Sequence, residues 1–208
     1  MAPVARHIEA VVFDVGHVLF DWHPRHLYLR LIDDPDRLEW FLANVVTLEW
    51  HFQHDAGMSV AEANKRLIAL YPEERALIEA YAPRFNETVP GPIPGSLELV
   101  DALAARDVPL YAITNFGAEF WAGFRPTQKI FDHFRDIVVS GVERMVKPDP
   151  AIFRLAVERF GIDPATSLFI DDRADNVAAA RAVGMAGHVF RDAPALKTAL
   201  VDYGLLQG

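Results

Sequence analysis

The chain has 208 residues, of which 51% are hydrophobic and 24% charged, and it contains no cysteine. This composition predicts an ordinary globular protein of one domain, or a domain with a smaller insert, and excludes disorder over most of the chain. Disulfides, thiolate zinc sites and thiol catalysis are excluded as well. A net charge of -9 without any basic cluster argues against nucleic acid as a partner.

The N-terminal region predicts neither export nor membrane attachment. The apolar run within residues 1–14 is too short for a signal peptide, and Glu9 interrupts it. No stretch approaches the roughly 20 apolar residues that are needed to span a bilayer. We therefore expect a cytoplasmic protein with no membrane partner.

Short apolar runs that end in polar residues predict the strands of a buried sheet. In chain order they cover residues 10–13, 109–113, 136–139, 167–170 and, more weakly, 188–190. Helical patterns lie between these runs, at residues 96–104, 152–160 and 177–183. Gly161 and Gly184 follow two of these helices, as expected after a last turn. Strands that alternate with helices predict an α/β fold with a Rossmann-like parallel sheet and right-handed crossovers.

Residues 22–88 break this alternation, because they show only helical periodicity. The predicted helices of this segment cover residues 27–32, 38–46, 59–70 and 73–85. Ser59 and Glu62 form the pattern of a capping box at the start of the third. The proline-rich stretch 90–95 then predicts a stiff hinge. We expect an α/β core of residues 1–21 and 89–208, with a helical insert at 22–88.

Polar residues follow three of the predicted strands or precede the helix that ends at Phe160: Asp14, Thr114, Asn115, Lys147, Asp171 and Asp172. In open parallel sheets, ligands bind beyond the carboxyl ends of the strands, so these side chains should meet in one crevice. Three carboxylates that close together repel one another unless a divalent cation neutralises them. Mg²⁺ with a phosphate group fits, because Mg²⁺ takes one or two carboxylates and shares substrate oxygens.

The order of these residues resembles the haloacid dehalogenase superfamily over nearly the whole chain. Four stretches are similar to its four motifs, in the right order, at residues 13–19, 113–115, 146–148 and 170–176. The resemblance implies that residues 22–88 are the helical cap of that family. The first motif also resembles the branch of glucose-1-phosphate-phosphatase-like enzymes, which has glycine two residues after the nucleophile.

The resemblance implies a role for each acid. Asp14 would be the nucleophile that forms an aspartyl-phosphate, which splits one hard displacement into two easier ones. Asp14, Asp171, Asp172 and the backbone carbonyl of Gly16 would hold Mg²⁺.

The same resemblance places the phosphate group against four residues. Thr114 and Lys147 would be catalytic, because they hydrogen-bond and neutralise the phosphate oxygens. Asn115 and His17 complete the predicted phosphate and substrate contacts.

Gly16 departs from the pattern of most phosphatases in the superfamily. They have an aspartate at this position, which protonates the leaving group and then activates water. Here another group supplies the proton, or the leaving group needs little help. The departure leaves the reaction rate and the substrate range open.

The predicted function is that of a Mg²⁺-dependent phosphatase acting on a small phosphorylated metabolite. A 2-haloacid dehalogenase is the first alternative, although displacement of halide has no use for an acidic pair such as Asp171 and Asp172. A phosphate-binding module without turnover is the second. Neither the substrate nor the oligomeric state follows from the sequence.

Two histidines of the insert, His51 and His54, have a spacing that suits half of a metal site. No second pair completes it, so we expect them to pack within the insert, with substrate contact as the next possibility. The aromatic residues of the insert are expected mostly to pack as well; they are Trp40, Phe41, Trp50, Phe52 and Tyr81.

Overall fold

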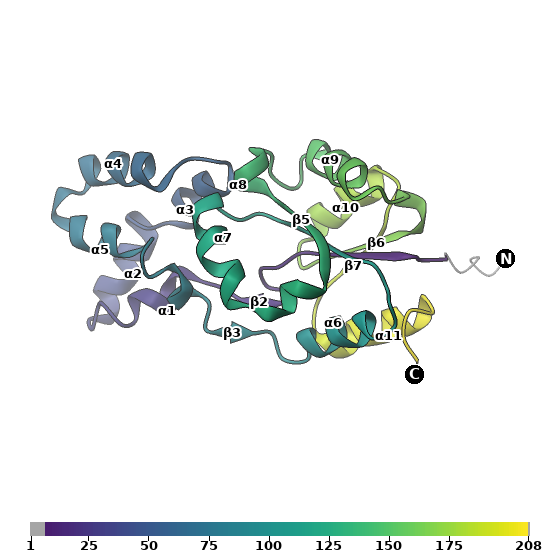
Figure 1. Cartoon of the computed structure of the whole chain (residues 1–208). Helices are drawn as coiled ribbons and strands as arrows, with labels where there is room; N and C mark the ends of the chain where they lie inside the picture. Colours follow the sequence, from purple (N-terminus) through teal and green to yellow (C-terminus); the bar gives the residue numbers. More distant parts are fainter. Residues whose placement is uncertain (1–6, 208) are drawn as a thin grey trace.

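The computed structural model of the protein describes residues 7–207 (Figure 1). Its centre is a five-stranded sheet in the order β5-β4-β1-β6-β7, with all neighbouring strands parallel. The strands are β1 (Ala10–Phe13), β4 (Leu110–Thr114), β5 (Phe134–Val139), β6 (Ser167–Asp171) and β7 (Ala186–Val189). The predicted α/β fold with a parallel sheet is thus confirmed, although β5 and β7 each begin two residues earlier than expected.

Helices cover both faces of the sheet (Figure 1). Helices α9 (Pro150–Phe160) and α10 (Ala174–Ala182) cover one face, and α6 (Ser96–Ala104) and α11 (Ala193–Asp202) cover the other. Successive side chains of a strand point to opposite faces. In β1, Val12 therefore packs in the cluster of α9 and α10, whereas Val11 belongs to the cluster of α6 and α11. This burial on two sides explains why the strands are continuous apolar runs.

The segment of residues 22–88, hereafter the helical segment, contains five α-helices at the left of Figure 1. They are α1 (Pro24–Tyr28), α2 (Pro35–Asn44), α3 (Leu48–Asp55), α4 (Val60–Leu70) and α5 (Arg75–Ala80), with 3₁₀ turns at Pro72–Glu74 and Phe85–Thr88. The continuous helix predicted over 73–85 was wrong, because the chain turns between Ala80 and Phe85. Helix α3 was not predicted.

The predicted capping box at the start of α4 forms in part. Ser59 Oγ accepts a hydrogen bond from the backbone N–H of Glu62 at 3.3 Å. The Glu62 carboxylate, however, accepts from Arg66 Nε at 2.7 Å, on the next turn of the helix.

A short antiparallel ribbon joins the helical segment to the sheet. It pairs β2 (Phe20–Asp21) with β3 (Gly91–Pro92). The stretch predicted as a hinge therefore holds a strand, and Pro92 is tolerated there because a ribbon of two strands leaves one edge of each unpaired. The two chain connections to the helical segment consequently lie side by side.

Aromatic residues bind the helical segment to the rest of the molecule in one hydrophobic cluster. The rings of Phe85 and Phe120 stack with their centroids 4.3 Å apart. Phe120 belongs to α7 (Ala118–Phe124), which was not predicted, and further unpredicted turns are α8 (Ser140–Glu143) and the 3₁₀ turns Arg125–Thr127, Lys129–His133 and Pro164–Thr166. None of the helices within residues 7–207 is both long and apolar enough to cross a membrane.

Candidate active site

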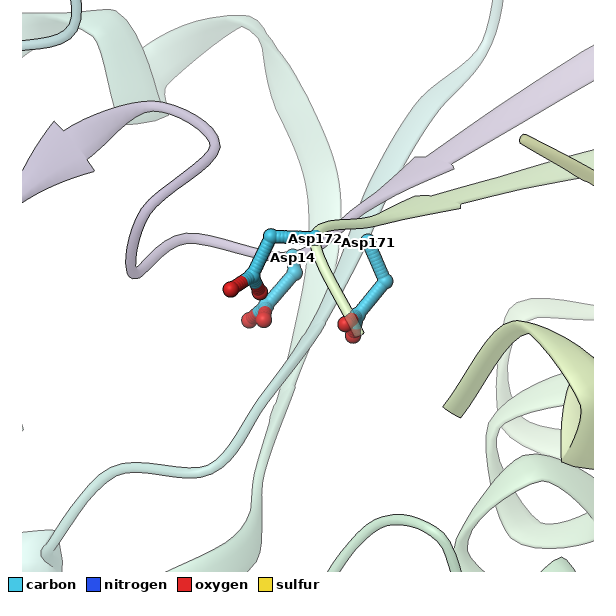
Figure 2. A group of neighbouring side chains, drawn as sticks. All are labelled: Asp14, Asp171 and Asp172. Carbon is cyan, nitrogen blue, oxygen red and sulfur yellow. The ribbon is translucent and has the colours of Figure 1, made fainter. Parts of the chain in front are cut away.

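Three aspartates meet at the carboxyl ends of two neighbouring strands. Asp14 directly follows β1, Asp171 is the last residue of β6, and Asp172 comes next. The pairing of β1 with β6 brings Asp14 level with Asp171. One carboxylate oxygen from each of the three lies within 4.8 Å of the others. Figure 2 shows the three side chains pointing to the same side of the strand ends.

Lys147 is the one buried cation of this cluster among the residues described. Its Nζ lies 2.9 Å from Asp14 Oδ1 and 2.7 Å from Asp171 Oδ2. The Asp171 carboxylate also accepts hydrogen bonds from Asn176 Nδ2 at 3.0 Å and from the backbone N–H of Arg173 at 2.8 Å. Asn176 therefore holds the acidic loop, as expected, and Asp175 is exposed, as expected.

One ammonium does not balance three carboxylates. Burial, together with repulsion from Asp171, raises the pKa of Asp14 to about 8 against the opposing attraction of Lys147. Burial and then Asp171 raise the pKa of Asp172 as well. Burial lowers the pKa of Lys147, but Asp14 and Asp171 outweigh burial and raise it. This excess of buried negative charge, offered by oxygen ligands, suits a hard divalent cation such as Mg²⁺.

Asn115 and Thr114, both predicted to contact the phosphate group, have different surroundings in the structure. The Asn115 side chain bridges the backbone of Lys147, since its Oδ1 accepts from Lys147 N at 2.9 Å and its Nδ2 donates to Lys147 O at 3.0 Å. Asn115 thus holds Lys147 in place while also lining the pocket. Thr114 is the buried last residue of β4, and its Oγ1 has no hydrogen-bond partner among the residues described.

Gly16 and His17 form the loop beside the acids. Both line the pocket, and His17 is exposed with a left-handed φ of 56°. Gly16 has no such φ, and a Cβ built on it would meet no atom within 4 Å. A larger side chain at position 16 is therefore compatible with this backbone, so glycine is not required there by conformation.

A pocket of about 250 Å³ opens above the acids, and helix α3 forms one wall of it. Four α3 residues line the pocket at positions i, i+3, i+4 and i+7: Leu48, His51, Phe52 and Asp55. Residues at this spacing share one helix face. The spacing is visible in the sequence, but α3 itself was not predicted, so Leu48, Phe52 and Asp55 were missed. Arg173, also in the wall, was missed too.

The two histidines of α3 take different places. His51 lines the pocket, and its Nδ1 lies 2.8 Å from the Tyr81 hydroxyl. His54 is buried behind it against Phe120. Burial lowers the pKa of His51 to about 3 and that of His54 to about 4. Across residues 7–207, the cluster with metal-binding geometry is that of the three aspartates, without these histidines.

Known proteins are similar to this chain in sequence. The family model of the haloacid dehalogenase-like hydrolases matches residues 8–184. The chain is 28% identical over 181 residues to the sesquiterpene phosphatase astK of Aspergillus oryzae. The aligned region covers 86% of this chain and 88% of that protein.

Solved structures share the fold. A haloacid dehalogenase family enzyme from Bacteroides thetaiotaomicron, in complex with magnesium and inorganic phosphate, has a TM-score of 0.68 at 23% identity, over 89% of this chain and 95% of that one. The L-2-haloacid dehalogenase of Xanthobacter autotrophicus has a TM-score of 0.62 at 19% identity, over 93% of this chain and 82% of that one. The chain belongs to the haloacid dehalogenase-like hydrolases. The chain is also similar to phosphoglycolate phosphatase 1 of Pseudomonas aeruginosa, with 30% identity over 135 residues, which are 64% of this chain and 45% of that protein.

Proposed function

We propose that the protein is a Mg²⁺-dependent phosphatase that hydrolyses a small phosphate monoester through a covalent phosphoryl intermediate on Asp14. The observation that carries this proposal is the meeting of a nucleophilic carboxylate, a buried ammonium and an acidic pair in one pocket. A halide displacement needs no such acidic pair. The similar Bacteroides enzyme, which forms a complex with magnesium and inorganic phosphate, supports the same interpretation.

Each residue has one part in this reaction. A carboxylate oxygen of Asp14 attacks phosphorus, and water then attacks the phosphoryl group on Asp14. Lys147 neutralises the phosphoryl oxygens and aligns Asp14. Asp14, Asp172 and the Gly16 carbonyl would hold Mg²⁺, whose charge stabilises the transferring group when it is bound. Asp171 already accepts from Lys147, Asn176 and the Arg173 backbone, so it contributes mainly its charge.

An assay on two classes of substrate, with and without Mg²⁺, tests the proposed function. The purified protein is given an aryl phosphate with excess Mg²⁺ or with EDTA, and separately 2-chloropropionate. We expect Mg²⁺-dependent release of phosphate and no release of chloride. Chloride release that is indifferent to EDTA would instead establish the dehalogenase. If neither ion is released, the chain is a binding module without turnover on these substrates.

Binding of Mg²⁺ should depend strongly on pH. The raised pKa values of Asp14 (about 8) and Asp172 mean that protons occupy the site below these values. These protons must leave when the metal binds. The affinity for Mg²⁺ should therefore rise about tenfold per pH unit for each proton released, and it should level off above the pKa of Asp14. Calorimetric titration with Mg²⁺ from pH 6 upward measures this. Asp172→Asn should weaken binding throughout, and a pH-independent Kd in the parent protein would refute the ligand set.

The pocket entrance favours an organic group with apolar surface. Leu48 and Phe52 are 53% and 41% exposed, although both are large and apolar, and both belong to the pocket wall. Exposed apolar side chains beside a phosphate site would be covered by the substrate. We therefore propose that the phosphorylated substrate has an apolar part that packs on α3, which the similarity to a sesquiterpene phosphatase supports.

Phe52→Ser should lower kcat/KM for phosphates with long apolar groups by roughly tenfold, because burial of an aromatic side chain is worth about 1.5–3 kcal/mol. The loss should vanish for a short, polar ester such as phosphoglycolate. Leu70→Ser is the matched control, since Leu70 is 73% exposed on α4 and does not line this pocket. Equal losses on both kinds of substrate would mean that Phe52 does not select the organic group.

A further inference from the structure

The reaction needs a proton donor that position 16 does not provide. When the ester bond breaks, its electron pair stays on the leaving oxygen, and an alkoxide is a poor leaving group unless it is protonated. Gly16 has no side chain, and the space where a Cβ would stand is open. The pocket that holds the acids and a smaller cavity of about 50 Å³ next to it are both lined by Gly16 and by Asp55. Asp55 is thus a carboxyl group from the helical segment that faces the same space.

The backbone and carboxylate of Asp55 are held from several sides. Ser140 Oγ donates to the Asp55 carbonyl at 2.7 Å, and the backbone N–H of Gly117 lowers the pKa of the carboxylate. His51 Nε2 lies 3.5 Å from Asp55 Oδ1. Only 6% of Asp55 is exposed, and its Oδ1 has no hydrogen-bond partner among the residues described. Asp55 Oδ1 is therefore a buried carboxyl oxygen that no hydrogen bond within the described residues satisfies.

Building on the phosphatase function proposed above, we propose that Asp55 is the general acid and base of the reaction. As the P–O bond to the leaving group breaks, the proton of the Asp55 carboxyl moves to the leaving oxygen while Asp14 bonds to phosphorus. In the second step a water oxygen bonds to phosphorus and its proton passes to Asp55. The bond between Asp14 and phosphorus then breaks, which frees phosphate and restores both carboxyl groups to their starting states.

The surroundings of Asp55 keep a proton available near neutral pH. Burial raises its pKa to about 7, against the opposing effects of the Gly117 N–H and the charge of Lys147. His51 beside it is neutral, and Tyr81 behind His51 keeps its proton, because burial raises the pKa of that hydroxyl well above 10. Tyr81 thus donates to His51 Nδ1, which leaves the His51 proton on Nε2, the atom nearest Asp55. A carboxyl group with a pKa near the working pH is suited to give and take a proton.

Substrates with different leaving groups distinguish a role of Asp55 in proton transfer from a merely structural role. Asp55→Asn is nearly isosteric with the parent side chain but has no acidic proton. Its kcat/KM should fall by about 10²–10⁴-fold on an alkyl phosphate such as glycerol phosphate. On p-nitrophenyl phosphate, whose anion leaves without help, the loss should be at least about tenfold smaller than the loss on the alkyl ester. Glu49→Gln, which removes an exposed acid from the same helix, should keep the parent values on both. Equal losses of Asp55→Asn on the two esters would overturn the proposal.

A pH profile of the parent protein does not depend on the folding of Asp55→Asn, and a rescue variant adds a second test. With saturating Mg²⁺, the parent protein should lose kcat/KM on the alkyl ester as pH rises through the pKa of Asp55, with a much weaker fall on the aryl ester. The double variant Gly16→Asp/Asp55→Asn should regain alkyl turnover over Asp55→Asn, since position 16 has room for the side chain. Identical alkaline profiles for the two esters would contradict the role of Asp55. If the parent protein hydrolyses neither ester, the phosphatase function itself fails, and this inference with it.

Discussion

Asp14→Asn should lower kcat/KM for phosphate esters by about 10⁴-fold or more and leave the fold intact, because the amide is nearly isosteric but cannot attack phosphorus. Lys147 keeps its pairing with Asp171 in this variant, so no buried cation is left alone. Steady-state phosphate release, with circular dichroism and thermal unfolding as checks on the fold, measures the effect.

Asp175→Asn is the matched control for this variant, since Asp175 is an exposed acid in the first turn of α10 and pairs with Arg173. It should retain activity close to that of the parent. If Asp14→Asn kept more than a few per cent of the parent turnover in a preparation free of contaminating phosphatases, Asp14 would not be the nucleophile.

Lys147→Met should destabilise the protein more than any substitution at the exposed edge of the site. Lys147 is 2% exposed, and its ammonium contacts two buried carboxylates, which would lose this positive charge in the variant. Removing one partner of a buried ion pair typically costs about 3–5 kcal/mol, which lowers Tm by roughly 6–20 °C for a chain of this size. Thermal unfolding at pH 7 without divalent cations measures the effect, and activity should be lost as well.

The response of Lys147→Met to Mg²⁺ tests whether the acidic cluster binds a cation. Mg²⁺ should restore part of the lost Tm in Lys147→Met, because a cation in the site neutralises the carboxylates that Lys147 left unpaired. Lys65→Met, at an exposed position of α4, should change neither Tm nor the response to Mg²⁺. A Tm for Lys147→Met equal to that of the parent would show that the ion pairs do not support the fold.

The sheet and its acids were predictable from the sequence for one physical reason. Strands buried on both faces are continuous apolar runs, and the residue that ends such a run lies at the edge where ligands bind. Asp14 and the pair Asp171–Asp172 could therefore be placed together from their positions at strand ends, and Lys147 was added from its place before the helix that ends at Phe160. Their distances, and the engagement of Asp171 by Asn176, needed the structure.

The helical segment and its part in the site were less predictable. Helix α3 has polar and aromatic residues on several sides, because its inner face contacts both the hydrophobic cluster and the pocket. Its apolar periodicity is correspondingly weak, so neither α3 nor the part of Asp55 in the pocket was predicted. Helix α11 was missed although its signals were present: Asp192 caps it by accepting from Ala195 N at 2.8 Å, and Pro194 lies in its first turn.

The most direct test of the central claim is the detection of phosphate on Asp14 itself. The parent protein is mixed with excess phosphate ester and Mg²⁺, quenched in acid during turnover, digested, and analysed by mass spectrometry, with Asp14→Asn treated in parallel. A covalent mechanism predicts one added phosphoryl group on the peptide that contains Asp14, absent from the variant and absent when EDTA replaces Mg²⁺. A parent protein that turns over rapidly, yet shows no phosphorylated Asp14 at any quench time and releases phosphate equally well as Asp14→Asn, would contradict the account.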